Sequence, residues 1–206
     1  MGKQKLMGND RARQLLAQEA ARIIVEQGVR DYRAAKVKAA ERLGMHARGA
    51  LPGNAEIELA VSEHLQLFGG ESHAELLRAF REVALAAMEF LAEHSPRLVG
   101  PVLNGTADAN SSVNLHVFAD SPEIVALLLS DLGMAYRPYE RRLRSQRNRK
   151  AAAEAYAGFQ FRLKHTSIEA TVFPVDGIRQ APISPIDGRP MRRADTQTVR
   201  EMLAAD

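Results

Sequence analysis

The stretch that decides the fold is LVGPVLNGTADANSSVNLHVF, residues 98–118. Two apolar segments, 98–103 and 113–118, flank a polar connection that contains Gly105 and Thr106. Short apolar runs bounded by glycine and polar residues predict two β-strands. A glycine followed by a hydroxyl residue at a strand end can present backbone N–H groups to an anion. Gly105 and Thr106 are therefore candidate phosphate-binding residues.

The sequence after this stretch predicts more strands and one helix. Apolar and polar residues alternate in 159–164 and again in 168–173, as in half-buried strands. Ser121-Pro122 is a typical helix start and Gly133 a typical stop, so 121–132 predicts a helix. We expect the four strands to form one mixed or antiparallel sheet, with this helix packed on one face.

The chain before residue 95 has helical periodicity instead. Apolar residues recur at helical spacing in four segments between residues 10 and 94, separated by glycine- or proline-containing connections. We therefore expect an α+β protein with a helical region over 1–95 and an α+β domain over 96–206. The proline- and arginine-rich segment 181–194 predicts an irregular C-terminal tail before a last short helix.

The central stretch resembles the opening of the DNA-polymerase-beta-like nucleotidyltransferase superfamily. In that superfamily, a strand ending in Gly-Ser or Gly-Gly is followed by Ser-Asp-x-Asp on the next strand. Here Gly105-Thr106 is similar to the first part, and Ser111-Ser112-Val113-Asn114-Leu115 lies where the second belongs. The phrases PRLVGPVLNGTA and HVFAD are also similar to those of uncharacterised bacterial proteins labelled nucleotidyltransferases. The resemblance covers about residues 96–174 and implies a nucleotidyltransferase-like mixed sheet.

The resemblance also implies a catalytic site and identifies what this chain has changed in it. Ser112 and Asn114 occupy the positions of the superfamily's paired aspartates, and Glu169 in SIEATVF looks like its third acid. The superfamily binds magnesium through these acids, and magnesium prefers anionic oxygen ligands. With one carboxylate in place of three, we expect a nucleotidyltransferase-like protein with weak or no activity. The alternative is an active magnesium-dependent enzyme with a displaced metal site that uses Asp108 or Asp120.

A dense basic run follows the predicted helix, over residues 137–150. Such runs attract phosphates, so a nucleotide or a nucleic acid is the expected partner, and a solvated basic loop is the simpler interpretation. The candidate phosphate-binding arginines in this run are Arg141, Arg142, Arg144, Arg147 and Arg149. A third hypothesis is a helix-turn-helix regulator, because residues 20–45 read as two basic helices. Gly49, Pro52 and Gly53 interrupt the recognition helix that should follow.

Composition excludes several classes of protein. The chain has 206 residues, no cysteine and a formal net charge of +3, so disulfides and thiolate metal sites are excluded. The polar start MGKQKLMGNDRAR lacks the apolar core of a signal peptide, and no apolar run reaches the roughly 20 residues of a membrane helix. We therefore expect a cytoplasmic protein without a membrane partner. The oligomeric state does not follow from the sequence.

Overall fold

The structure is a computed structural model that describes residues 2–29, 31–45, 51–144 and 152–205. It divides into two compact units, Met1–His73 and Ala74–Asp206. The division falls in the first turn of a long helix, whereas the sequence places the boundary at residue 95. The reason is that the apolar stripe of this helix packs into the core of the second unit.

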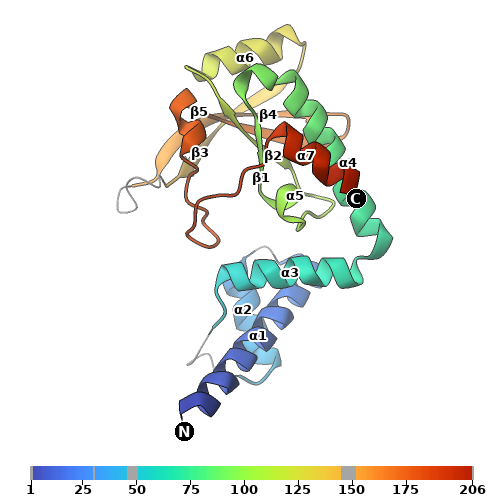
Figure 1. The fold of residues 1–206 in the computed structure, drawn as a ribbon, viewed down its shortest axis with the longest axis vertical. Coiled ribbons are helices and arrows are strands. Elements are labelled where there is room, and N and C mark those ends of the chain that lie inside the picture. The colour runs from blue at the N-terminus through green and yellow to red at the C-terminus, as the bar shows by residue number, and fades with distance from the viewer. Residues whose placement is uncertain (1, 30, 46–50, 145–151, 206) are drawn as a thin grey trace. The chain divides into compact units, whose positions relative to one another are not determined.

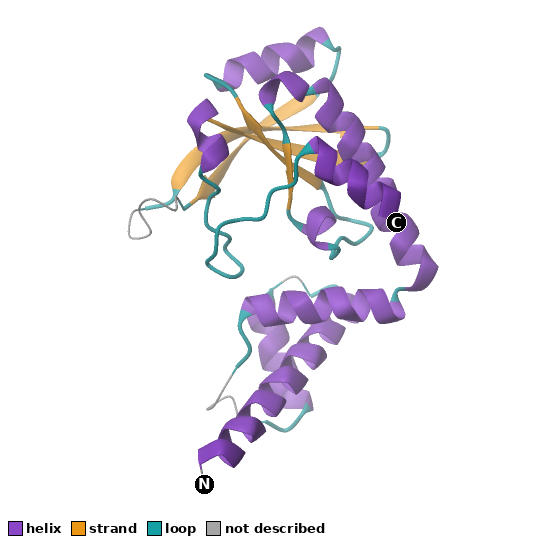
Figure 2. Ribbon diagram, in the orientation of Figure 1, coloured by secondary structure: helices purple, strands orange, loops and turns teal. Residues whose placement is uncertain are grey.

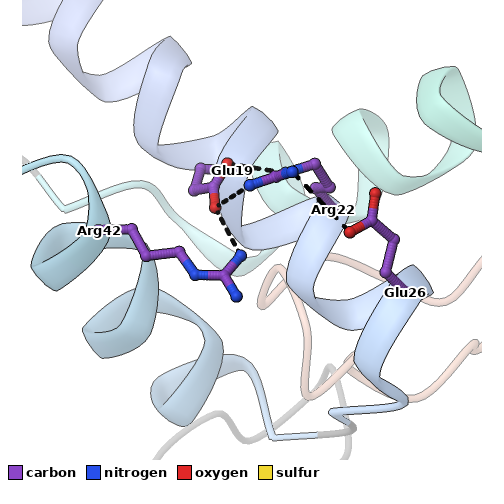
Figure 3. Close-up of polar contacts among 4 residues, drawn as sticks. All are labelled: Glu19, Arg22, Glu26 and Arg42. Atoms are coloured by element: carbon purple, nitrogen blue, oxygen red, sulfur yellow. Dashed lines mark hydrogen bonds and ion pairs between the residues drawn. The ribbon is translucent and has the colours of Figure 1, made fainter.

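The first unit consists of helices α1 (Gly2–Gln27), α2 (Tyr32–Arg42) and α3 (Asn54–Phe68). Ile23 of α1 and Ile57 of α3 are fully buried in its core, where many of the other residues are alanines. The Glu19 carboxylate on α1 accepts hydrogen bonds from Arg22 on the same helix and from Arg42 on α2 (Figure 3). With α4, these are the four helices that the sequence predicts before residue 94.

The second unit is an α+β structure whose elements are labelled in Figure 1 and coloured by type in Figure 2. Its helices are α4 (Gly70–Phe90), α5 (Pro101–Asn104), α6 (Pro122–Asp131) and α7 (Thr196–Ala205). There are two short 3-10 helices: η1 (Ala92–His94) follows α4, and η2 (Val175–Arg179) follows the last strand. Its strands are β1 (Arg97–Val99), β2 (Val113–Phe118), β3 (Tyr136–Leu143), β4 (Glu154–Leu163) and β5 (Thr166–Phe173).

In the described part of the chain the strands form one five-stranded mixed sheet, in the order β1-β2-β5-β4-β3. Strands β2 and β5 are parallel, and the other neighbouring pairs are antiparallel. The prediction that 113–118 and 168–173 share a sheet is confirmed, and the two strands are direct neighbours. Their register pairs Asn114 with Glu169.

One face of the sheet is packed against helices and forms the core. Leu115, Ala170 and Phe161 from the strands meet Met88 of α4 and Leu129 of α6 there, and each is buried. Figure 1 shows α4, α6 and α7 gathered around the sheet. Because alternate strand residues point to opposite faces, the polar residues between these apolar ones lie on the other face. We call this second surface the polar face.

The predicted strand 98–103 is wrong beyond residue 99. The chain turns at Gly100, where φ is 76° and ψ is −152°, a conformation that L residues with a side chain rarely adopt. Pro101 then starts the short helix α5, since a proline ring is tolerated in the first turn of a helix. The apolar residues Val102 and Leu103 are buried on this helix rather than on a strand.

The C-terminal segment runs from one edge of the sheet to the other. Ile183 forms a β-bridge with Arg144, just after edge strand β3, and Ala194 forms one with Leu98 of the opposite edge strand β1. Between them the segment has no longer stretch of helix or strand, as its prolines predict. Helix α7 follows, which agrees with the predicted last helix.

Candidate functional site

The polar face carries a row of polar side chains that crosses four strands. Register pairs Asn114 of β2 with Glu169 of β5, Glu169 with Gln160 of β4, and Gln160 with Arg137 of β3. Direct cross-strand partners point to the same face, so the four side chains form one line, which we call the central polar row.

Arg141 joins two members of this row. Its Nη2 donates to Glu169 Oε2, and its Nη1 lies 3.4 Å from Asn114 Oδ1. The side chains of Arg141 and Glu169 are 34% and 22% exposed, so the pair is partly shielded from water. One permanent positive charge therefore lies beside the single carboxylate of the site. We refer to Arg141, Asn114 and Glu169 as the Arg141 cluster.

The turn after β1 closes one side of this cluster. A Cβ atom at Gly100 would lie 3.2 Å from Asn114 Nδ2, which is tighter than most such contacts. Asn114 Nδ2 also lies 3.4 Å from the carbonyl oxygen of Ser112, the residue just before β2. The glycine at the strand end therefore lies against Asn114, one of the two positions at which the resemblance leads us to expect aspartates.

The structure gives Gly105 and Thr106 a different role from the predicted phosphate cradle. Both backbone N–H groups donate to the carbonyl oxygen of Pro101, which closes the last turn of α5. Gly105 adopts the left-handed conformation with φ 78°, as expected of a glycine at a helix end. These N–H groups stabilise a helix end and are engaged internally.

The described part of the basic run, residues 137–144, does not form one surface. Arg141 lies on the polar face, whereas Arg142 alternates to the other face and pairs with Glu140 at 3.3 Å. Arg144 lies beyond β3 and is exposed. Arg147 and Arg149 lie outside the described residues. The described arginines therefore lie in different environments, because residues 137–143 belong to β3 and neighbouring residues of a strand point to opposite faces.

Among the described residues, Asp108 and Asp120, the acids expected at a displaced metal site, form no three-carboxylate group with Glu169 that could hold a metal ion. Asp108 accepts hydrogen bonds from the Asn110 N–H group and the Ser111 hydroxyl, both at 2.9 Å, and so stabilises its own turn. Asp120 is exposed after β2. Within the described residues there is no group of three or more histidines or acids that could hold a metal ion.

Sequence reasoning missed a tyrosine that spans two strands. Tyr139 of β3 pairs with Gly158 of β4, and its ring passes over this glycine. The phenol oxygen thereby reaches Thr171 Oγ1 on β5 at 2.8 Å. Burial raises the pKa of Tyr139, so the phenol stays protonated at neutral pH. Tyr139 and Arg141 are two residues apart on β3, so alternation places them on the same face. The contact of Tyr139 with Thr171 follows only from the register of β3 against β4 and of β4 against β5.

Replacing Gly158 by alanine should destabilise the protein. The new Cβ would lie 2.3 Å from Tyr139 Cζ, so the ring must leave its place. We expect the free energy of unfolding to fall by about 1–3 kcal/mol, measured by urea denaturation. In a Tyr139→Ala background the same substitution should cost much less, because the clashing ring is gone. Equal costs in both backgrounds would contradict this packing.

His116 and Arg193 attach the C-terminal segment to the polar face. The Arg193 Nε donates to His116 Nδ1 at 3.1 Å, and its Nη1 donates to the Gly177 carbonyl oxygen at 2.9 Å. The guanidinium carbon lies 5.0 Å from the centroid of the Phe118 ring and 5.2 Å from that of Phe173. Burial lowers the pKa of Arg193 to about 10. This end of the polar face is therefore covered.

The neutral state of His116 predicts a pH-dependent stability. Burial, with the positive charges of Arg193 and Arg141, holds the pKa of His116 well below its usual value of 6.5. Below about pH 6.5 the unfolded chain takes up a proton that the folded protein does not bind, so stability falls with falling pH. Between about pH 7.5 and about pH 5.5 this one group should remove about 1.4 kcal/mol.

Urea denaturation at the two pH values measures this contribution. Between these two pH values His116→Gln should lose about 1.4 kcal/mol less of its free energy of unfolding than wild type loses, whatever its stability at neutral pH. His165→Gln, at an exposed position, should keep the wild-type dependence. If His116→Gln and wild type lose the same free energy on acidification, His116 is not held neutral.

Comparisons of the chain with protein-family models, with curated proteins and with solved structures found no match. No helix among the described residues has the length and apolar character needed to span a membrane.

Proposed function

We propose that the second unit is a nucleotidyltransferase-like domain that binds a nucleotide without a metal ion and has little or no transferase activity. The observation that carries this proposal is the position of Arg141, whose guanidinium contacts both Asn114 and Glu169. These are the second acid-pair position and the third-acid position of the superfamily that the sequence resembles.

Charge explains why the arrangement favours binding over catalysis. Two-metal transfer requires carboxylates that are free to share divalent ions. In this site Glu169 supplies one negative charge, which Arg141 already compensates, and Asn114 contributes a neutral amide. A second positive ion would be repelled by the guanidinium. A phosphate oxygen would instead be attracted, since guanidinium groups bind phosphates through paired hydrogen bonds.

The charges of the polar face favour an anionic ligand. Register and alternation place four strand arginines on this face, Arg97, Arg137, Arg141 and Arg162. The strand carboxylates there are Glu154 and Glu169. Aromatic and hydroxyl groups, such as those of Tyr139 and Thr171, add the neutral contacts that a base or sugar needs.

Calorimetric titration of the full chain with the four ribonucleoside triphosphates tests the proposal. We expect binding of at least one, with affinity reduced about tenfold or more in Arg141→Met, because a charged hydrogen-bonding partner is lost. Arg142→Met removes the same charge from the next residue, which points to the other face, and should bind within about twofold of wild type. Absence of binding by all four nucleotides would refute the proposal.

Arg141→Met and Arg142→Met also distinguish nucleotide binding from the alternative, in which the basic run binds a nucleic acid. If the basic run acts as a whole, a single-stranded oligonucleotide should bind more tightly than any nucleotide. Arg141→Met and Arg142→Met should then weaken that binding equally, and both should reduce its dependence on salt. The described contacts favour the nucleotide, since they separate the two arginines onto opposite faces.

A further inference from the structure

An open groove of about 400 Å³ lies at the end of the sheet where β3 begins and the β4–β5 hairpin turns. Its polar lining is Arg137, Gln160, Arg162 and Ser167, and Ala135, Tyr136 and Phe161 complete it. The volume is within the range of small-molecule sites. The groove lies away from the end of the polar face that Arg193 and the C-terminal segment cover.

The charged groups of this groove are both positive. Its lining contains two guanidinium groups and no carboxylate. Arg162 Nη2 donates to the His165 carbonyl oxygen at 2.8 Å, which fixes the head of that side chain at the hairpin. The Arg137 side chain is exposed, and its guanidinium has no hydrogen bond or ion pair with any other residue that the structure describes. One arginine is thus held in place and the other is available.

The groove also has two neutral polar side chains, Gln160 and Ser167, next to its arginines. Gln160 Nε2 donates to Ser167 Oγ at 3.2 Å, which orients the amide and leaves the hydroxyl hydrogen of Ser167 as a further donor. Gln160 is the register partner of both Arg137 and Glu169, so the groove continues directly into the central polar row. The groove therefore lies one strand away from Glu169 of the Arg141 cluster.

We propose that this groove binds the phosphate group of a phosphorylated ligand, held by Arg137 and Arg162. Two guanidiniums offer several N–H donors to one set of phosphate oxygens, and such charge-assisted bonds are stronger than neutral ones. The assignment rests on the proposed function, since it adds a second phosphate contact, beside that of Arg141, for the proposed nucleotide ligand. The rest of the ligand then lies along Gln160 toward Glu169, with no metal ion needed to neutralise the phosphate.

Inorganic pyrophosphate is the probe for this site, because it carries the charge without a base or sugar. In the full-length protein, NMR signals of the Arg137 and Arg162 Nε–H groups, assigned with Met variants, should shift on addition of pyrophosphate. Pyrophosphate affinity should fall at least about tenfold in Arg137→Met/Arg162→Met. Lysine at both positions should restore part of it, since the charge returns without the paired donors.

Arg78→Met is the matched control, because Arg78 is an exposed arginine on α4 that pairs with Glu82. It should bind pyrophosphate like wild type, and all variants should unfold at the wild-type temperature within a few degrees. Unshifted arginine signals, or equal pyrophosphate affinity in the double variant and wild type, would overturn the assignment.

The two proposals fail in different ways. If a nucleotide binds and depends on Arg141 but is indifferent to Arg137→Met/Arg162→Met, the phosphate site is wrong and the proposed function stands. If pyrophosphate binds through Arg137 and Arg162 but no nucleotide binds more tightly than pyrophosphate, the groove is a phosphate site and the nucleotide function fails.

Discussion

Replacing Phe161 by alanine should lower the free energy of unfolding by about 3–5 kcal/mol, a large part of the stability of a small domain. Phe161 is 2% exposed and lies between the sheet and α4, with its ring centroid 5.9 Å from that of Phe90. It also joins Tyr136 and Ile168 across the sheet. Truncation of the Phe161 side chain would leave a cavity, because the neighbouring strands β3 and β5 are held in the sheet and cannot move to close it.

Urea denaturation followed by circular dichroism measures this loss. Leu127→Ala is the matched control, because Leu127 on α6 is 63% exposed and should change stability by no more than about 0.5 kcal/mol. A loss below about 1 kcal/mol for Phe161→Ala would mean that this aromatic residue is not central to the core.

The second large effect should be the creation of a metal site. The triple variant Ser112→Asp/Asn114→Asp/Arg141→Ala adds two carboxylates, one of them at the register partner of Glu169, and removes the cation that contacts Glu169. We expect it to bind Mn²⁺ with a dissociation constant of about 1 mM or lower, because oxygen ligands with negative charge suit this ion. Water-proton relaxation measures the binding.

The double variant Ser112→Asp/Asn114→Asp, which keeps Arg141, is the control that isolates the arginine. We expect it to bind Mn²⁺ at least about tenfold more weakly than the triple variant, since one carboxylate charge stays compensated. Equal affinities would show that Arg141 does not occupy the electrostatic place of a metal. Tight binding by the wild type would contradict the account more strongly.

The sequence predicted the parts of the fold that local pattern controls. A short apolar run identified 113–118 as a strand, alternation identified 168–173, and Ser121-Pro122 identified the start of α6. The apolar residues after Gly100 were assigned to a strand because short buried helices and buried strands have the same composition. The turn at Gly100, with φ 76° and ψ −152°, ends the strand and decides between them, and the local pattern does not show it.

The site could be predicted only in part, for a related reason. Residues two apart on a strand share a face, so the face of Asn114 followed from the sequence, and the resemblance nominated Glu169 as its partner. The third member of the cluster, Arg141, could not be placed. Its contact depends on the register of β3 against β4 and of β4 against β5, which long-range packing determines. The same holds for Tyr139 and Thr171.

We expect Arg141 to take the place of the metal ions in nucleotide binding. The most direct test is one calorimetric titration of the wild type with its best-binding ribonucleoside triphosphate, carried out in EDTA and repeated in millimolar magnesium. We predict dissociation constants that agree within about threefold, because no carboxylate pair is available to hold the ion. Binding that appears only when magnesium is present would contradict the account.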